Sequence, residues 1–583
     1  MRRRRVLRAA LAMSIGLMLV AGCASPQTPQ SGGQSSAATV ANRPAGQRTL
    51  NVAVTNSIDA MSIIGSSTTS GGWQSLNELH SDGLVTADRN TQTPVARLAA
   101  QVPSLDNGLL EILPDGREKS TYPLRHDVTW QDGTPFTARD MLFSFQLDTD
   151  PKVPFLNRDA LQEADSAEAP DDYTFVVYWK APYYQADSIG LRALWPHPRH
   201  LLEQSYQTLD TPAFINLPYW TSQYVHLGAF RLTDFQPGVS LTFAAYEGYF
   251  LGRPKLDRVI VKMFNDEPTL YAATMAGSVD MLMDNSLSAE LGLQLKDEWD
   301  RSGQGTVYEG TGTTRFIAPQ FNREFQQQPA ALDPRVRQAL MSAVDRSAIS
   351  ATVQHGHGEL IANSLLPPGD KLYDAVKDRW ASYSYDPARA QATLGQLGWS
   401  PGNDGVLVGP GGARFTTNLW TTEGGESEIA IIADYWKKVG VSAEQYVIGG
   451  AIVRDREART KYPGFETSAR GSGDSILSRV NTQAIANAAN RYSGGNRGGY
   501  SNPQLDQLIT RYYRSISTQD QSAAIRAIDD VVAADLPVML LYFNPTTPAV
   551  RKGIKALDDF RGGAEASRLF GTFSRNAYQW DLS

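Results

Sequence analysis

The chain has 583 residues, with 54 basic and 61 acidic side chains and a formal net charge of −7. This length is too great for one hydrophobic core and is sufficient for two or three domains. The acidic balance argues against a nucleic-acid partner and against broad adhesion to anionic lipid. Cys23 is the single cysteine, so no disulfide can form within the chain.

The N-terminal segment has the pattern of a secretory signal. Four arginines follow Met1, an uncharged stretch covers residues 9–20, and Val20-Ala21-Gly22-Cys23 comes next. The apolar run is too short to span a bilayer, and a basic head with small residues before the cut is typical of signal peptides. The motif resembles a bacterial lipoprotein signal, so we expect removal of residues 1–22 and a lipid on Cys23. An ordinary signal peptide with a chance cysteine is the alternative, and the export route stays open.

The expected mature chain begins with a tether. Residues 23–47 are mostly Ser, Gln, Pro, Gly, Ala and Thr without apolar periodicity, which predicts a flexible linker. Loss of residues 1–22 removes five arginines and no acid, which leaves a net charge of −12. Order is expected from Thr49–Val54, which alternates at the period of a strand. Strand-like and helix-like patterns then alternate to the end, so the sequence predicts an α/β fold.

Several later elements are clear from their residues. Three further strands are predicted, at Tyr173–Trp179, Val259–Met263 and Leu536–Phe543. The strong apolar character of the last one favours the centre of its sheet. Three helices are predicted to begin at Pro334, Pro387 and Pro503. Proline is favourable in the first turn of a helix, where its missing N–H costs nothing.

The string Leu124–Asp140 carries a family resemblance. It reads Leu-Arg-His-Asp-Val-Thr-Trp-Gln-Asp-Gly-Thr-Pro-Phe-Thr-Ala-Arg-Asp, which predicts a strand, a tight Asp-Gly turn and a helix capped near Thr137. It resembles the pattern of the extracytoplasmic solute-binding proteins of peptide and nickel ABC importers, family 5. Similar segments follow in the family's order at 249–257, 277–280, 333–346, 385–399 and 500–503. The resemblance covers the chain from about Leu50 to Trp580.

The resemblance implies a periplasmic-binding-protein-like fold of the large, three-domain type II variant. Two lobes would close over a ligand, with an extra domain beside the first lobe. The expected division is 48–95, 215–310 and 535–583 in lobe I, 96–214 in the extra domain, and 311–534 in lobe II. Trp130, Trp399 and Asp140 are expected to hold the fold, since buried aromatics are usually core.

The resemblance also suggests where a ligand binds. Peptide-binding relatives hold the ligand's free amine with an aspartate shortly before the Tyr-Ser-Asn-Pro segment, and Asp474 fits that place. The residues around Asp474 are small, where relatives often have Trp and a second acid, so a role as a helix cap or loop residue stays open. Arg470 could meet a carboxylate or phosphate on the ligand, or pair with Glu466.

Four further regions supply ligand-binding candidates. Trp420 and Thr421 follow a predicted strand, and ligands in α/β sheets bind beyond the carboxyl ends of strands. Trp420 could therefore stack on the ligand. Asn56, at the end of the first strand, is a candidate by the same argument. Asn322 and Tyr500 are weaker candidates.

No motif for a metal, a cofactor or catalysis is found. The closest histidine pairs, His355 with His357 and His197 with His200, lack a cysteine or acidic set at ligand spacing. The chain has no Gly-x-Ser-x-Gly elbow, no phosphate-binding loop and no His-Glu-x-x-His. No metal, no cofactor and no enzymatic activity are therefore expected.

The favoured hypothesis is a monomeric receptor outside the cytoplasmic membrane, anchored to it by lipid, that captures oligopeptides for ABC permease subunits. The alternative is a relative without import function that binds a glycolipid or sugar conjugate and regulates envelope assembly. The small residues around Asp474 motivate that alternative.

Overall fold

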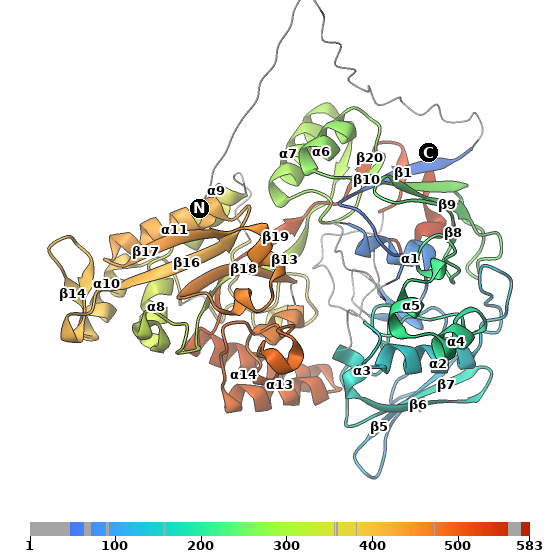
Figure 1. The fold of residues 1–583 in the computed structure, drawn as a ribbon, viewed down its shortest axis with the longest axis horizontal. Coiled ribbons are helices and arrows are strands. Elements are labelled where there is room, and N and C mark those ends of the chain that lie inside the picture. Colours follow the sequence, from blue (N-terminus) through green and yellow to red (C-terminus); the bar gives the residue numbers. More distant parts are fainter. Residues whose placement is uncertain are drawn as a thin grey trace, which may run out of the picture. The chain divides into compact units, whose positions relative to one another are not determined.

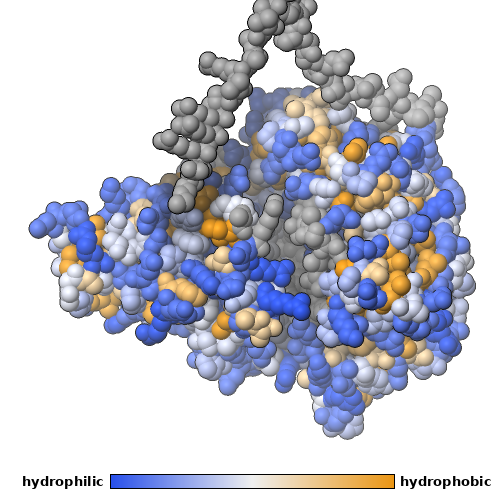
Figure 2. All heavy atoms as spheres, viewed as in Figure 1, coloured by the Kyte–Doolittle hydropathy of each residue, from blue (hydrophilic) through white to orange (hydrophobic). Residues whose placement is uncertain are grey.

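The computed structural model describes residues 47–62, 64, 72–88, 93–154, 159–354, 356, 360–380, 382–471, 473–557 and 573–582. The predictions for Cys23 and for His355 and His357 therefore fall outside the described residues. Among the helices that are described, none combines the length and the apolar character needed to cross a membrane. On the face seen in Figure 2, apolar residues are scattered among hydrophilic ones, as is usual for a surface in contact with water.

The first lobe is built on a seven-stranded sheet in the order β12-β20-β11-β1-β10-β9-β8 (Figure 1). β1 (Thr49–Thr55) lies parallel between β10 (Arg258–Phe264) and β11 (Met281–Leu282), and both predicted strands of this lobe are confirmed. β1 has neighbours on both sides, and every residue of it except the half-buried Asn51 is buried. The other elements are β8 (Phe230–Gln236), β9 (Ser240–Ala245), β12 (Gly305–Val307), β20 (Ala549–Arg551), α1 (Asn77–His80), α6 (Glu267–Met275) and α7 (Ala289–Ser302).

The extra domain carries a four-stranded sheet in the order β4-β5-β7-β6. Its elements are β4 (Leu110–Ile112), β5 (Glu118–Pro123), β6 (Ala164–Asp171), β7 (Thr174–Trp179), α2 (Ala138–Thr149), α3 (Asp159–Glu163), α4 (Arg199–Thr208) and α5 (Thr211–Ile215). β7 confirms the strand predicted at 173–179. A pair of short strands, β2 (Val85–Ala87) and β3 (Pro94–Ala96), lies just before this domain in the chain.

The family string forms a turn and a capped helix in the extra domain. Gly133, with φ at 92°, donates its N–H to Trp130 O at 2.8 Å and closes the predicted turn. Thr137 caps α2, and its backbone N–H donates to Asp140 Oδ2 at 2.9 Å. The predicted strand is displaced, because β5 ends at Pro123, before the string begins. Trp130 is fully buried, as expected for a core residue.

The second lobe is built on a five-stranded sheet in the order β17-β16-β18-β13-β19. Its strands are β13 (Gly310–Pro319), β16 (Thr416–Thr422), β17 (Ser442–Ile448), β18 (Phe465–Gly471) and β19 (Met539–Thr546). Its helices are α8 (Pro334–Ser342), α9 (Arg346–Val353), α10 (Pro387–Gln396), α11 (Glu426–Lys438), α12 (Gly450–Arg454), α13 (Pro503–Arg514) and α14 (Thr518–Asp535). The two remaining small sheets pair β14 (Ser400–Pro401) with β15 (Leu407–Val408) and β21 (Ile554–Lys555) with β22 (Asp581–Leu582).

The three helices predicted from proline are confirmed in α8, α10 and α13. In each, the residue before the proline accepts a hydrogen bond from a backbone N–H of the first turn, through the side chains of Asp333, Asp386 and Asn502. A side-chain acceptor and a proline in the first turn together remove two of the unpaired donors at a helix start.

β19 differs from its prediction in two ways. It lies at the edge of its sheet and not at the centre, and it pairs with β13 of the second lobe, although residues 535–583 were expected in lobe I. The strand is buried because another segment covers its free edge. Phe543 donates its N–H to Leu360 O at 2.7 Å, and Ala362 donates to Leu541 O at 3.2 Å. The apolar sequence of β19 therefore indicates that the strand is buried, but it does not indicate where the strand lies in the sheet.

Two short segments connect the sheets of the two lobes. The chain passes from β12 to β13 through residues 308–309 and returns from β19 to β20 through residues 547–548. The segments lie side by side, since Tyr308 donates its N–H to Pro548 O at 2.8 Å. α7 packs closely on the second segment. A Cβ on Gly292 of α7 would overlap the Thr547 hydroxyl and lie 2.6 Å from Thr547 Cβ.

Gly292→Ala is expected to lower the free energy of unfolding by about 1–3 kcal/mol, the usual cost of overpacking, because Thr547 is buried and cannot give way. The matched control is Gly395→Ala in α10, where an added Cβ meets nothing within 4 Å. That substitution should raise the free energy of unfolding by about 0.4–1 kcal/mol. Denaturant unfolding measures both, and equal effects of the two substitutions would contradict the packing described.

Candidate functional site

A cavity of about 430 Å³ lies between the extra domain and the second lobe. We call it the inner cavity. Its volume falls in the range of small-molecule sites. The extra domain lines it with residues 162–163 and 183–185, and the second lobe lines it with Arg470, Asp474, Tyr513 and a polar segment between 475 and 495. The structure thus brings together two of the predicted ligand-binding residues, Asp474 and Arg470.

Asp474 lies in the first turn of a 3₁₀ helix (Gly473–Arg479) that follows β18. Its Oδ2 accepts a hydrogen bond from the hydroxyl of Tyr184 in the extra domain. Burial raises the pKa of Asp474, and the Tyr184 hydrogen bond and the charge of Lys371 offset only part of that rise. A cation placed against this carboxylate would stabilise its ionised form. Among the described residues, no backbone N–H donates to Asp474, so the helix-cap alternative finds no support in the hydrogen bonds.

Arg470 lies near the end of β18, opposite Thr314 of β13. Its Nε is buried and has no hydrogen-bond partner among the described residues. Burial, and then the nearby charge of Arg497, lower the pKa of Arg470. The pairing of Arg470 with Glu466 is wrong, because two other arginines occupy Glu466. A guanidinium of this kind in a cavity wall suits an anionic group on a ligand.

Glu466 lies on the same strand as Arg470 and is the centre of a cluster of ion pairs. Its carboxylate is 3% exposed and accepts from Arg459 Nη2 at 2.5 Å and from Arg497 Nη2 at 2.7 Å. Arg497 also donates to Ser468 Oγ at 3.0 Å. Burial raises the pKa of Glu466, but the charges of Arg497 and Arg459 outweigh burial and bring that pKa below its ordinary value. The ion pairs hold β18 and the segment around Arg497 together beside the inner cavity.

The candidates on the neighbouring strand β16 do not line the inner cavity. Thr421 is fully buried, and its hydroxyl accepts a hydrogen bond from Thr467 Oγ1 at 2.9 Å. The ring of Trp420 packs against Tyr446 of β17, with 5.0 Å between the ring centroids. Both side chains therefore contact their own lobe in this structure.

The three remaining candidates also lie away from the inner cavity. Tyr500 donates its hydroxyl to Asp535 at 2.5 Å. Asn322 accepts from the N–H of Glu324 at 3.0 Å, within a local turn. Asn56 has a φ of 66° and donates its N–H to Phe264 O at 2.8 Å.

Three tyrosines of the inner cavity were missed by the sequence analysis. Tyr183 and Tyr184 come from the extra domain, and Tyr513 comes from the end of α13. Two adjacent tyrosine pairs, at 183–184 and 512–513, were the available signal. Nothing in the sequence indicates that Tyr184 lies beside Asp474, because the two residues are 290 positions apart in the chain.

The described residues contain no group of three His, Cys, Asp or Glu side chains placed to hold a metal ion. His197 and His200 make separate contacts. His197 Nε2 lies 2.9 Å from Asp148 Oδ1, and His200 Nε2 lies 2.7 Å from Asp132 Oδ2. The inner cavity offers the largely buried carboxylate of Asp474, the exposed carboxylate of Glu163, the guanidinium of Arg470, and aromatic and neutral polar side chains.

Comparisons with known proteins identify the family and the fold of the chain. The sequence model described as "Bacterial extracellular solute-binding proteins, family 5 Middle" matches residues 95–472. The chain is 25% identical over 458 residues to the oligopeptide-binding protein AppA of Bacillus subtilis (strain 168), and the match covers 76% of this chain and 77% of that relative.

Two solved structures show the same two-lobed fold. The oligopeptide-binding protein from Thermus thermophilus, complexed with a pentapeptide, has a TM-score of 0.70 at 22% identity, and the match covers 92% of this chain and 96% of that one. NikZ from Campylobacter jejuni, in complex with Ni(L-His), has a TM-score of 0.69 at 21% identity, with 91% of this chain and 99% of that one covered. At such identities the likeness concerns the fold.

Glu466→Gln is expected to lower the free energy of unfolding by about 3 kcal/mol at neutral pH, the lower end of the range for a broken buried pair, because two guanidiniums that are each 16% exposed lose their anion. The matched control is Glu247→Gln, whose carboxylate is 72% exposed and pairs with Arg253 at the surface. Loss of that pair should change stability little. Denaturant unfolding of the three proteins measures both effects.

The difference in free energy of unfolding between the wild type and Glu466→Gln should also depend on pH. A carboxyl whose pKa is lowered by folding contributes stability above its unfolded pKa, about 4.3, and loses it as the pH falls through the folded value. The gap between the wild type and Glu466→Gln should therefore narrow in acid. A gap that stays constant down to the acid transition would contradict the assigned ion pairs.

Proposed function

The chain belongs to family 5 of the bacterial extracellular solute-binding proteins, and on that premise we propose that it captures oligopeptides and delivers them to an ABC permease. The observation that carries the proposal is that Asp474 and Arg470 both line one cavity. A peptide has an ammonium group at one end and carboxylates elsewhere, so it matches a wall that offers both a buried carboxylate and a guanidinium. The relatives described as oligopeptide-binding add support.

Asp474 is the proposed anchor of the peptide's ammonium group. Its pKa is raised by burial, so ionisation of this carboxyl is unfavourable unless a cation lies beside it. An ion pair between this carboxylate and a ligand ammonium group is therefore stronger than the same pair at the surface. The hydroxyl of Tyr184 occupies Oδ2 and leaves Oδ1 for the ligand. Arg470 is proposed to receive a carboxylate. The family's members bind solutes, and we propose that this chain likewise performs no chemical turnover.

We propose that the protein is located outside the cytoplasmic membrane and that a lipid on Cys23 anchors it there. The support is the signal-like pattern of residues 1–22 and the tether-like composition of residues 23–47. Such a linker lets a folded body move relative to its anchor. We propose that the protein acts as a monomer.

Asp474→Asn is expected to weaken binding of a free-amine peptide by a few hundredfold, since loss of one member of a buried charge pair costs on the order of 3–5 kcal/mol. N-terminal acetylation of the peptide should weaken binding to the wild type by a similar factor and should add little further loss in the variant. Calorimetry measures the affinity of the wild type and of Asp474→Asn for the free-amine peptide and for the acetylated peptide. Asp378→Asn, which removes an exposed acid, is the control. Equal losses on acetylation in both proteins would rule out Asp474 as the anchor.

The affinity of the wild type for a free-amine peptide should fall as the solution is acidified, because only the ionised carboxylate attracts an ammonium. The midpoint should lie above the ordinary aspartate value of 3.8, since the pKa of Asp474 is raised. Asp474→Asn should remove this dependence of affinity on pH.

The class of ligand can be tested by thermal stabilisation. If a glycolipid or sugar conjugate stabilises the protein against heat while a diverse peptide pool does not, peptide capture is the wrong assignment.

Cys23→Ser is expected to release the protein from the membrane fraction, because the lipid acceptor is the thiol of Cys23. Fractionation and labelling with a fatty acid in the native host measure the effect. A variant that remains bound to the membrane and still takes up label would refute the anchor.

A further inference from the structure

Beside the inner cavity, arginines outnumber the acids that could pair with them. Four guanidiniums and one carboxylate influence one another there, and we call them the arginine cluster: Arg459, Arg470, Arg479, Arg497 and Glu466. Glu466 pairs with Arg459 and Arg497. Arg470 and Arg479 have no carboxylate partner among the described residues, and the Nε of each is buried without a hydrogen bond. The cluster therefore carries three positive charges more than it has negative ones.

Arg479 lies directly behind the wall of the inner cavity. Its Nη1 donates to Gly495 O at 2.7 Å, and Gly495 itself lines the cavity. Burial, and then the charges of Arg497 and Arg470, bring the pKa of Arg479 well below its ordinary value, and the charge of Glu466 offsets only part of this. An arginine side chain nevertheless stays protonated in a protein. The positive charge of Arg479 is therefore kept beside the cavity without an anion to balance it.

Arg470 is the member of the cluster that lines the inner cavity. The pKa of Arg470 is lowered by burial and by Arg497, and no acid opposes this fall. Asp474 lines the same cavity, but the cation that opposes the rise of its pKa is Lys371 and not Arg470. The inner cavity therefore has two electrically separate ends, an acidic end at Asp474 and a basic end at Arg470.

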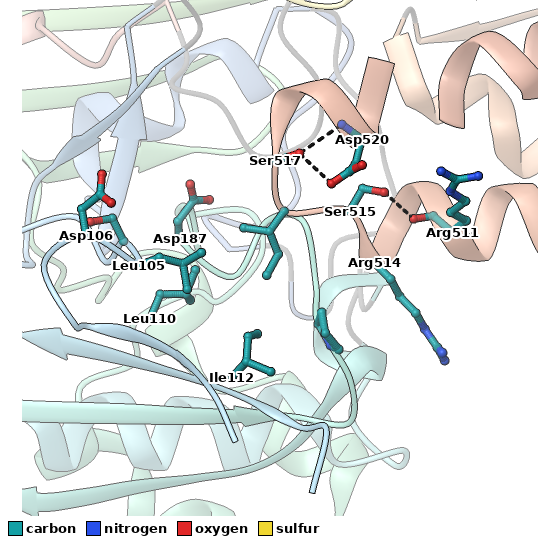
Figure 3. A pocket seen from close by; sticks show the side chains of 13 residues that line it. Leu105, Asp106, Leu110, Ile112, Asp187, Arg511, Arg514, Ser515, Ser517 and Asp520 are labelled. Carbon is teal, nitrogen blue, oxygen red and sulfur yellow. Dashed lines mark hydrogen bonds between the residues drawn. The ribbon is translucent and has the colours of Figure 1, made fainter. Parts of the chain in front are cut away.

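The second large cavity of the molecule has no such excess of positive charge. It is an outer groove of about 750 Å³, formed by residues 104–112, 182 and 187 of the extra domain and residues 511–520 of the second lobe. Two arginines and three acids line it, and Figure 3 shows these residues: Arg511, Arg514, Asp106, Asp187 and Asp520. Of these two cavities, only the inner one therefore suits a ligand group with more than one negative charge.

On the basis of the proposed function, in which a peptide binds in the inner cavity, we propose that the arginine cluster selects peptides whose last residue is an aspartate or a glutamate. Such a residue carries its α-carboxylate and its side-chain carboxylate close together. The planar fork of Arg470 binds one carboxylate, and the charges of Arg479 and Arg497 behind the wall stabilise the other. The ammonium group of the same peptide lies at the acidic end, beside Asp474.

The test compares two tripeptides that differ only in the last side chain, Ala-Ala-Glu and Ala-Ala-Gln. The wild type should bind the first about ten- to hundredfold more tightly, because the glutamate adds a hydrogen-bonded interaction between charged groups. Arg470→Gln should remove most of this difference. The matched control is Arg389→Gln, which removes an exposed arginine of α10 in the same lobe and should leave the difference as in the wild type. Calorimetry measures the affinities.

The melting temperature of the ligand-free protein tests the arginine cluster without any peptide. Arg470→Gln should raise this temperature, because it removes a charge that repels Arg497 and has no anion beside it. Arg459→Gln should lower it, because it breaks an ion pair with Glu466. A comparable fall in both variants would show that the charge of Arg470 is balanced within the chain, and would overturn the basic end of the cavity.

Two further outcomes separate a failure of the selectivity from a failure of the proposed function. Equal affinity of the wild type for the two tripeptides would overturn the selectivity for an acidic last residue and leave peptide capture standing. If neither tripeptide binds, while glycerol phosphate binds to the wild type and not to Arg470→Gln, peptide capture and the acidic peptide both fail. The arginine cluster would then be a site for a phosphate group.

Discussion

The arrangement of this protein depends on one constraint: the sheets of its two lobes are joined by only two short segments, which lie next to each other. The backbone hydrogen bond from Tyr308 to Pro548 holds residues 308–309 against residues 547–548. Paired segments of this kind act as one narrow joint, so all other contacts between the lobes are noncovalent. Such a joint permits closure of two rigid bodies, and a ligand favours closure only through its differential affinity for the closed form.

Two sets of polar contacts differ in what they connect: the ion pairs of Glu466 lie within the second lobe, and the hydrogen bond of Tyr184 to Asp474 joins the extra domain to the second lobe. Glu466 and its two arginines hold β18 and the segment around Arg497 together within the second lobe, and they make no contact with the extra domain among the hydrogen bonds described. Asp474 faces the other way and accepts from Tyr184 across the boundary. One residue thus belongs both to the proposed ammonium site and to the contact between the extra domain and the second lobe.

The sequence predicted the local features well, because their causes are local. A proline after Asp or Asn fixes the start of α8, α10 and α13 within one turn, and the alternation at Thr49–Val54 identifies a strand directly. The edge position of β19 could not be read in this way. Its apolar residues show that it is buried, but a strand covered by residues 360–362 is buried as fully as one at the centre.

The candidate site was predicted only in part, for a related reason. Asp474 came from the family resemblance, and Arg470 became a candidate because it lies on the same segment, four residues earlier. Arg470 lies on the same face of β18 as Glu466, but the two arginines that pair with Glu466 come from outside the strand, Arg459 from just before it and Arg497 from a loop that follows it. Tyr184 was missed because its role arises only when the extra domain meets the second lobe.

The central claim is that the chain carries peptides, and native mass spectrometry of protein purified from its own host tests it most directly. If the chain carries peptides, bound species should leave on denaturation and fragment as peptides with free N-termini. Bound species that fragment as sugars or lipids, with no peptide among them, would contradict it.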